Sequence, residues 1–182
     1  MLENLKQFVP SEVCLSCDGC CRFKEPNSTW RPKVSGEEKK NIAVDDVRLI
    51  DKIFTSETVD DKNYLRTTRC HDLYHCVFHN PKDNTCGIYG RRPFECRLYP
   101  FILSRRKSKV VVFAHGNCPH VQQYRDHSSF RDYVEYLKTY FSQENVREFL
   151  RQNPFWIGDY SDYEAELELV FAVTDLDPTV HE

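Results

Sequence analysis

The chain has 182 residues, of which 40% are hydrophobic and 13% aromatic, enough to fill a core and to exclude a disordered tail. Its formal net charge of -3 at pH 7 argues against a surface tuned as a whole to nucleic acid or to an anionic membrane. The N-terminus lacks an apolar run of signal-peptide length, and no stretch approaches the roughly 20 apolar residues of a spanning helix. We therefore expect a cytoplasmic protein with neither a membrane nor nucleic acid among its partners.

The first feature along the chain is a crowded run of thiols, CLSCDGCC, at residues 14–21. In a reducing cytosol, nine cysteines are more typical of metal ligands or redox groups than of disulfides. Cys14, Cys17 and Cys20 follow C-x2-C spacing, which lets thiolates converge on one ion. The bacterial ferredoxin run needs a further cysteine that this chain lacks, so a fourth ligand must come from elsewhere. Cys21 is the local candidate, although it could instead serve a second metal.

The segments that follow predict a helical stretch and then several short strands. Ser35 and Glu38 form a capping-box pattern, which opens one or two helices that reach Phe54. Short strands are predicted at NYLRTT (63–68), HCVFH (75–79), TCGIY (85–89), FILS (101–104) and KVVVFA (109–114). The turn NPKDN joins the second and third of these strands, and RRKSK joins the last two into a hairpin. The cysteines would then lie on loops and at strand ends.

The C-terminal part predicts a long helix and a final strand. The helix begins at Ser128 and breaks near Ser142. Five of its residues fall on one face, as a core stripe would: Phe130, Tyr133, Leu137, Tyr140 and Phe141. Apolar residues then alternate at Leu167, Leu169, Phe171 and Val173, which predicts a strand that pairs with the sheet or with another copy. Residues 155–182 are acidic and residues 91–109 basic, so we expect attraction between them.

A second motif, CGIYGRRPFECRLYP at residues 86–100, identifies a family. Together with CLSCDGCC, with CVFHNPKDNTC from Cys76 to Cys86 and with NCP around Cys118, it resembles the CxxCxxCC cysteine-cluster family. Members are described as zinc- or iron-chelating domains, and flagellin lysine N-methylases carry a similar cluster. The resemblance implies metal ligation at the matching cysteines: Cys14, Cys17, Cys20, Cys21, Cys76, Cys86, Cys96 and Cys118. Cys70 has no match, and for it a ligand role and a small buried side chain are about equally favoured.

Three further residues of this motif could contact the metal or cluster. Thiolates around a divalent metal or an iron–sulfur cluster carry net negative charge, which Arg92 and Arg97 could offset unless they are ordinary surface residues. Tyr89 could take part in the site or belong to the core. Pro93 suits the first turn of a short helix, which would put Cys96 one turn later and aim free backbone amides at the cluster.

Histidines near the cysteines are weaker candidates. Each could replace a thiolate in a zinc or iron shell, but each is more often a surface or packing residue. The histidines concerned are His71, His75, His79, His115 and His120.

The whole pattern predicts an α+β chain with two parts. Residues 1–125 would form an irregular cysteine-cluster domain, with short strands and hairpins capped by helices. Residues 126–182 would form a helical extension that packs on it. The expected function is to hold iron, as an iron–sulfur cluster, or zinc. Iron is favoured because the C-x2-C-x2-C spacing and the proline after Cys118 are ferredoxin-like and no second C-x2-C pair is present. The alternatives are a metal- or cluster-dependent enzyme similar to flagellin lysine N-methylases and a zinc-stabilised protein that binds another protein.

Overall fold

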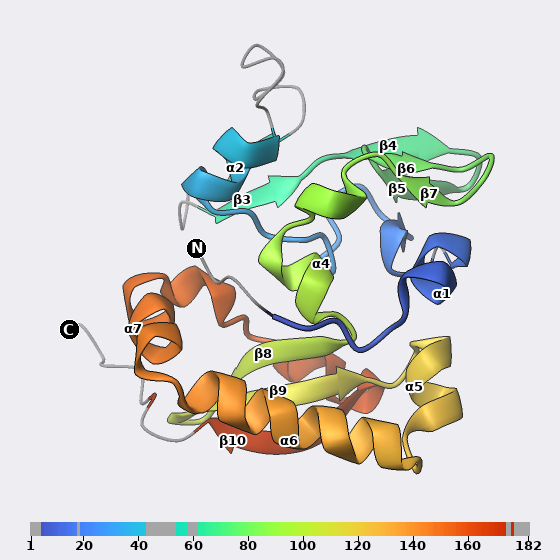
Figure 1. Ribbon diagram of the computed structural model, residues 1–182. Coiled ribbons are helices and arrows are strands. Elements are labelled where there is room, and N and C mark those ends of the chain that lie inside the picture. Colours follow the sequence, from blue (N-terminus) through green and yellow to red (C-terminus); the bar gives the residue numbers. More distant parts are fainter. Residues whose placement is uncertain (1–4, 18, 43–53, 58–61, 174–175, 177–182) are drawn as a thin grey trace. The chain divides into compact units, whose positions relative to one another are not determined.

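The computed structural model describes residues 5–17, 19–42, 54–57, 62–173 and 176, and it confirms the α+β class (Figure 1). By packing, the chain divides into two compact units. We call Val9–Arg97 the cysteine unit, and Met1–Phe8 with Leu98–Glu182 the sheet unit. The domain boundary expected at residue 125 stays a prediction, because packing does not show which part folds independently. No helix in the described ranges is long and apolar enough to cross a membrane.

The cysteine unit is built from short elements. Its helices and 3₁₀ turns are α1 (Ser11–Ser16), η1 (Gly19–Cys21), α2 (Gly36–Ile42), η3 (Tyr89–Arg91) and α4 (Phe94–Leu98). Its strands are β1 (Arg22–Phe23), β2 (Phe54–Glu57), β3 (Lys62–Leu65), β4 (Thr67–Cys70), β5 (Leu73–Cys76), β6 (His79–Asn80) and β7 (Thr85–Cys86). They form an antiparallel sheet in the order β1-β5-β4 and two hairpins, β2-β3 and β6-β7.

The helix α2 begins with the predicted capping box. The Glu38 N–H donates to Ser35 Oγ at 3.2 Å, and the Ser35 N–H donates to Glu38 Oε2 at 2.8 Å, so both orphan amides are satisfied. The predicted end of this helical stretch at Phe54 is wrong, because Phe54 begins the strand β2. The part of the prediction that covers residues 43–53 lies outside the described residues.

Two of the predicted strands are divided in the structure. NYLRTT contributes to both β3 and β4, with Arg66 between them, and HCVFH contributes the end of β5 and the start of β6. The period of two does not reveal these breaks, because each half still alternates. The NPKDN turn does join β6 to β7, and Asn84 there has a positive φ of 58°, which asparagine tolerates.

The sheet unit has longer elements around one antiparallel sheet. The strands are β8 (Phe101–Arg106), β9 (Lys109–His115) and β10 (Leu167–Val173), in the order β10-β9-β8. The helices and 3₁₀ turns are α5 (Pro119–Tyr124), α6 (Ser128–Ser142), α7 (Glu144–Gln152), η4 (Pro154–Trp156) and η5 (Ser161–Glu166). The predicted hairpin is confirmed as β8-β9, with a tight turn at Lys107, whose φ is 56°.

The long C-terminal helix is also confirmed. It runs along the sheet as α6 (Figure 1) and ends at Ser142, with α7 following after Gln143. Every residue of the predicted aromatic stripe is buried. Phe130 and Tyr133 pack against Phe101 of β8, with ring centroids 5.6 and 5.2 Å away. The stripe therefore fixes the helix to the sheet.

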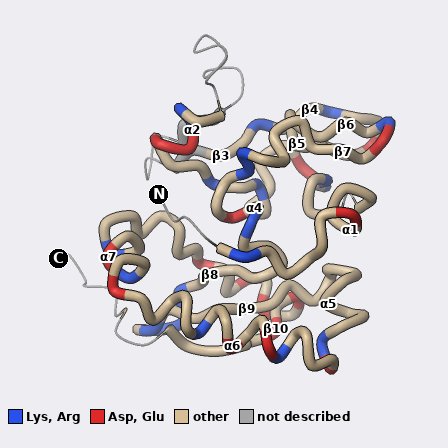
Figure 2. The backbone as a smooth tube through the Cα atoms, viewed as in Figure 1, with Lys and Arg blue, Asp and Glu red and all other residues tan. Residues whose placement is uncertain are grey.

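The final strand pairs within the chain. β10 lies antiparallel to β9, but a bulge between Leu169 and Phe171 shifts its register, so the alternation is imperfect and Leu169 is 48% exposed. Basic and acidic residues are interspersed over the sheet unit (Figure 2). The expected attraction includes an ion pair between Arg106 and Glu164, whose Nε and Oε1 atoms lie 3.4 Å apart.

Candidate metal centre

The CLSCDGCC run forms a helix and a turn that hold three thiols of a cluster. Cys14 lies in α1, and Cys20 and Cys21 lie in η1. The run bends where the Cys17 N–H bonds to the Cys14 carbonyl at 3.3 Å, which ends the helix α1. This bend lets the thiols before and after it approach each other.

Three thiols from later elements join this group. Cys76 ends β5, Cys86 ends β7 and Cys96 lies in α4. Cys21 is close enough to raise the pKa of each of the other five thiols. We call this set the six-thiol cluster: Cys14, Cys20, Cys21, Cys76, Cys86 and Cys96. All six belong to the cysteine unit, and Cys76 is part of its hydrophobic core, with Cys21 and Cys86 packed against it.

The thiols of the cluster are poorly solvated. Burial is the main cause that raises the pKa of Cys14, Cys86 and Cys96, and it raises the pKa of Cys76 to about 12. A hydrogen bond with Cys21 is the main cause that raises the pKa of Cys20. Without a metal these five thiols are therefore protonated at neutral pH, and metal binding would release protons.

Backbone amides point at two of the sulfurs. The N–H groups of Phe78 and His79 bond to the sulfur of Cys76, and that of Ile88 bonds to the sulfur of Cys86; each lowers the pKa of its thiol. Such N–H···S bonds stabilise thiolates bound to zinc or iron. Both cysteines lie outside the C-x2-C run.

Arg92 and Tyr89 lie beside the cluster and contact Cys14. The Arg92 guanidinium donates from Nη1 to Cys14 Sγ at 3.4 Å and from Nε to the Tyr89 carbonyl at 3.0 Å. It also lies over the Tyr89 ring, 3.6 Å from the centroid, where cation–π attraction holds it. The Tyr89 side chain bonds to Cys14 too and lowers the pKa of that thiol. A positive charge is thus fixed against the sulfurs.

The short helix α4 differs in one respect from its prediction. It begins at Phe94, directly after Pro93, and it carries Cys96 as expected. Its first amide does not point at the thiols, however, because the Phe94 N–H donates to Glu38 Oε1 at 2.6 Å. The buried Glu38 carboxylate, and not the metal cluster, is therefore the acceptor of this amide. The charge of Arg97 acts on this same carboxylate and lowers the pKa of Glu38, against burial, which is the largest influence and raises it.

The remaining cysteines have different surroundings. Cys17 is half-buried, and its sulfur accepts the Gly19 N–H at 3.5 Å. Cys70 is half-buried at the end of β4. Cys118 is buried at the N-terminus of α5, in the sheet unit. Whether Cys17 and Cys118 are ligands stays a prediction.

The histidines form two separate arrangements that the sequence did not predict. His75 and His79 are buried in the cysteine unit, with their Nδ1 atoms 2.9 Å apart. In the sheet unit, His115 Nδ1 lies 3.0 Å from the Tyr99 hydroxyl, and its Nε2 lies 3.5 Å from Glu166. A separation of four residues favours contact within a helix. His75 lies in β5 and His79 begins β6, so no pattern in the sequence indicated that these two side chains would meet.

Cysteine sulfurs are suitable ligands for zinc or iron, although the sulfurs of the six-thiol cluster are not arranged around a common point. Among the residues that the structure describes, no three Cys, His, Asp or Glu side chains are arranged at distances that would hold an ion. A metal ion binds thiolates and not thiols, so binding of an ion by these sulfurs requires their deprotonation. Soft thiolates with N–H···S bonds and a fixed guanidinium are the ligands and neighbours that zinc and iron–sulfur sites use.

Comparison with known proteins agrees with this chemistry. The model of the family CxxCxxCC, described as "Putative zinc- or iron-chelating domain", matches residues 13–128. No curated protein and no solved structure matches the chain. The matched range contains the whole six-thiol cluster together with Cys17, Cys70 and Cys118.

Proposed function

We propose that this chain, which belongs to the CxxCxxCC family of zinc- or iron-chelating domains, is a cytosolic protein that holds iron as an iron–sulfur cluster. The observation that carries the proposal is the six-thiol cluster around Cys21, with the Arg92 guanidinium 3.4 Å from Cys14 Sγ. Six neighbouring thiols have few other uses in a reducing compartment. The cluster supplies more sulfurs than the four of one tetrahedral site, so two metals that share ligands, or one site beside a redox pair, both fit the donor count.

The residues around the sulfurs support an anionic group. Arg92 offsets negative charge on the thiolates and donates a hydrogen bond to one of them, as outer residues do in tuned metal sites. The Tyr89 ring holds the Arg92 guanidinium in place by cation–π attraction. The amides that point at Cys76 and Cys86 add further donors. An iron–sulfur cluster supplies reversible one-electron chemistry, and in this chain these donors would set its potential.

The choice of iron over zinc rests on the C-x2-C-x2-C spacing, on the proline after Cys118 and on the arginine donor. Affinity order does not decide between the two metals, because an all-sulfur site suits both. Zinc sites more often use two separated C-x2-C pairs, and the later cysteines of this chain do not form one. Arg97 stays part of the proposal through its charge, and the role of Cys118 as a ligand stays a prediction from the sequence.

Metal content of the full chain, purified without air, tests the proposal. We expect a brown protein with iron and acid-labile sulfide in similar amounts, which bleaches in air. A colourless protein with stoichiometric zinc and no sulfide would overturn the iron assignment and leave a metal-stabilised protein that binds another protein. A folded, stable product without any metal would overturn metal binding itself.

A further inference from the structure

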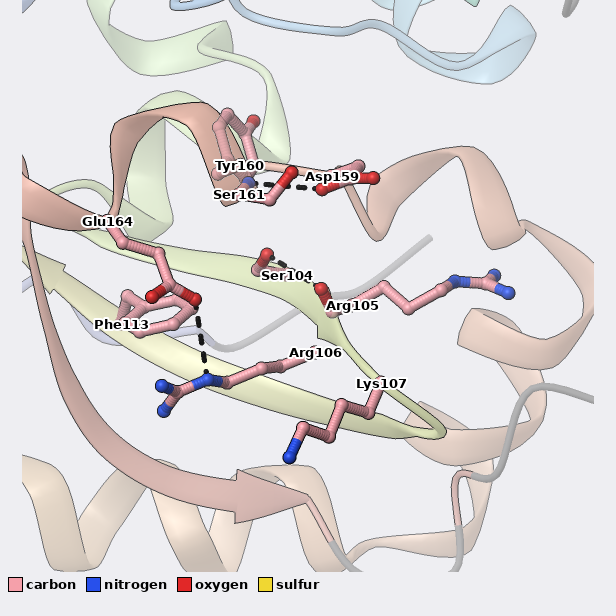
Figure 3. A pocket seen from close by; sticks show the side chains of 9 residues that line it. All are labelled: Ser104, Arg105, Arg106, Lys107, Phe113, Asp159, Tyr160, Ser161 and Glu164. Carbon is pink, nitrogen blue, oxygen red and sulfur yellow. Dashed lines mark hydrogen bonds and ion pairs between the residues drawn. The ribbon is translucent and has the colours of Figure 1, made fainter.

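A second site lies in the sheet unit, and none of the residues that line it is a cysteine. A cavity of about 440 Å³ opens beside the turn of the β8-β9 hairpin, within the size range of small-molecule pockets (Figure 3). Two buried rings line it, those of Phe113 from β9 and Tyr160 from the loop before η5. Arg106, Lys107, Ser161 and Glu164 provide its polar lining.

The wall that carries Tyr160 is held to the edge of the sheet. The Gly158 N–H donates to the Leu103 carbonyl at 3.1 Å, and the Arg105 N–H donates to the Gly158 carbonyl at 2.8 Å. A Cβ atom at position 158 would lie 2.3 Å from the Tyr160 ring, so glycine lets this ring lie directly over the backbone. The ring is thus held in place before any ligand arrives, which lowers the entropy cost of binding.

The Arg106 side chain of the cavity forms only a weak ion pair within the protein. Arg106 Nε lies 3.4 Å from Glu164 Oε1, and the two side chains are 44% and 49% exposed, so this ion pair contributes little to stability. Figure 3 shows the Arg106 and Glu164 side chains joined by this ion pair, with Lys107 beside Arg106. The guanidinium has more donors than the one that Glu164 engages. Asp159, the other carboxylate of the cavity, accepts the Ser161 N–H at 3.0 Å.

We propose that this cavity binds a small organic anion, in which a phosphate or carboxylate group is attached to an aromatic ring. The anionic group takes the place of the Glu164 carboxylate on Arg106 and reaches the Lys107 ammonium, and the ring of the ligand rests on Phe113 and Tyr160. Glu164 occupies the anion position when no ligand is bound. This site is distinct from the metal centre, because its lining residues belong to the sheet unit and the six thiols belong to the cysteine unit.

Calorimetric titration of the full chain with phenyl phosphate, benzoate and inorganic phosphate tests the site. We expect phenyl phosphate or benzoate to bind more tightly than inorganic phosphate, since only these two carry the ring. The tighter of the two identifies the anionic group. Arg106→Gln should weaken binding about tenfold, because it removes a charge-assisted hydrogen bond. Glu164→Gln should tighten it several-fold, because it removes the competing carboxylate.

The pair Arg125 and Glu168 provides the matched control. Its atoms lie 3.1 Å apart, its side chains are as exposed as those of Arg106 and Glu164, and neither residue lines the cavity. Glu168→Gln should therefore leave the affinity unchanged, although it alters the net charge by the same amount as Glu164→Gln. The proposal is overturned if no probe binds saturably, if Arg106→Gln binds as the wild type does, or if Glu168→Gln tightens binding as much as Glu164→Gln.

Discussion

Cys21 has a special position among the six thiols, because it is close enough to each of the other five to raise the pKa of that thiol. From spacing alone, Cys14, Cys17 and Cys20 had been the three ligands of one ion, with Cys21 a fourth ligand or part of a second site. The structure places Cys21 in the middle and turns Cys17 toward the Gly19 amide. The reason is the bend after α1, which breaks the periodicity on which the spacing argument depends.

The central position of Cys21 leads to a test with a built-in control. Cys21→Ser should lower metal affinity by more than the roughly 10- to 100-fold that loss of an outer-shell partner costs. Cys70→Ser, a change of the same kind at a half-buried cysteine that the sequence motifs do not include, should keep full metal content. Metal per chain after dialysis against a competing chelator measures both. If both variants lost the same amount of metal, metal binding would depend on the number of thiols in the chain and not on the geometry of the six-thiol cluster.

At the scale of the elements, Glu38 joins two helices of the cysteine unit. Its carboxylate accepts the Ser35 N–H at the start of α2 and the Phe94 N–H at the start of α4, at 2.8 and 2.6 Å. Two helix N-termini thus share one buried negative charge. Because α4 carries Cys96, this carboxylate also fixes the position of one thiol of the cluster.

Removal of that carboxylate should destabilise the unit. We expect Glu38→Ala to lower the free energy of unfolding by about 1.5–3 kcal/mol per charged hydrogen bond lost, partly offset by relief of the buried charge. Urea denaturation at matched metal content gives the value. Glu37→Ala, at the exposed neighbouring position in the same first turn, is the control and should cost well under 1 kcal/mol. A cost at position 37 equal to that at position 38 would contradict the shared-cap interpretation.

The elements also show what local sequence can and cannot predict. The capping box, the β8-β9 hairpin and the helix from Ser128 depend on neighbours within a few residues, and all three were predicted. The bond from Glu38 to Phe94 spans 56 residues, so no local pattern could reveal it. The same holds for the thiols of the site. The family resemblance gave their identity, but only the fold shows that Arg92 reaches Cys14 across 78 residues.

At the scale of the whole molecule, the two units differ in what stabilises them. The sheet unit has a stripe of buried aromatic side chains between α6 and its three strands. The cysteine unit has a small apolar cluster that includes three of the thiols themselves, and its strands have two to four residues. A unit with short strands and a small core has marginal stability unless a cross-link such as a disulfide or a metal adds to it. A bound metal would provide this cross-link.

Metal removal should therefore unfold one unit and spare the other. Treatment of the metal-loaded chain with a chelator should raise amide exchange throughout residues 9–97, because metal-binding energy is folding energy there, while β8, β9, α6 and β10 stay protected. Hydrogen exchange read by mass spectrometry resolves both parts in one sample. Exchange in α5 tests the role of Cys118, which occupies the N-cap position without a side-chain capping bond. If Cys118 is a ligand, protection of residues 119–124 falls together with that of the cysteine unit. Unchanged protection of residues 9–97 after complete metal loss would mean that the cysteine unit folds on its small core alone, and the metal would then have no structural role.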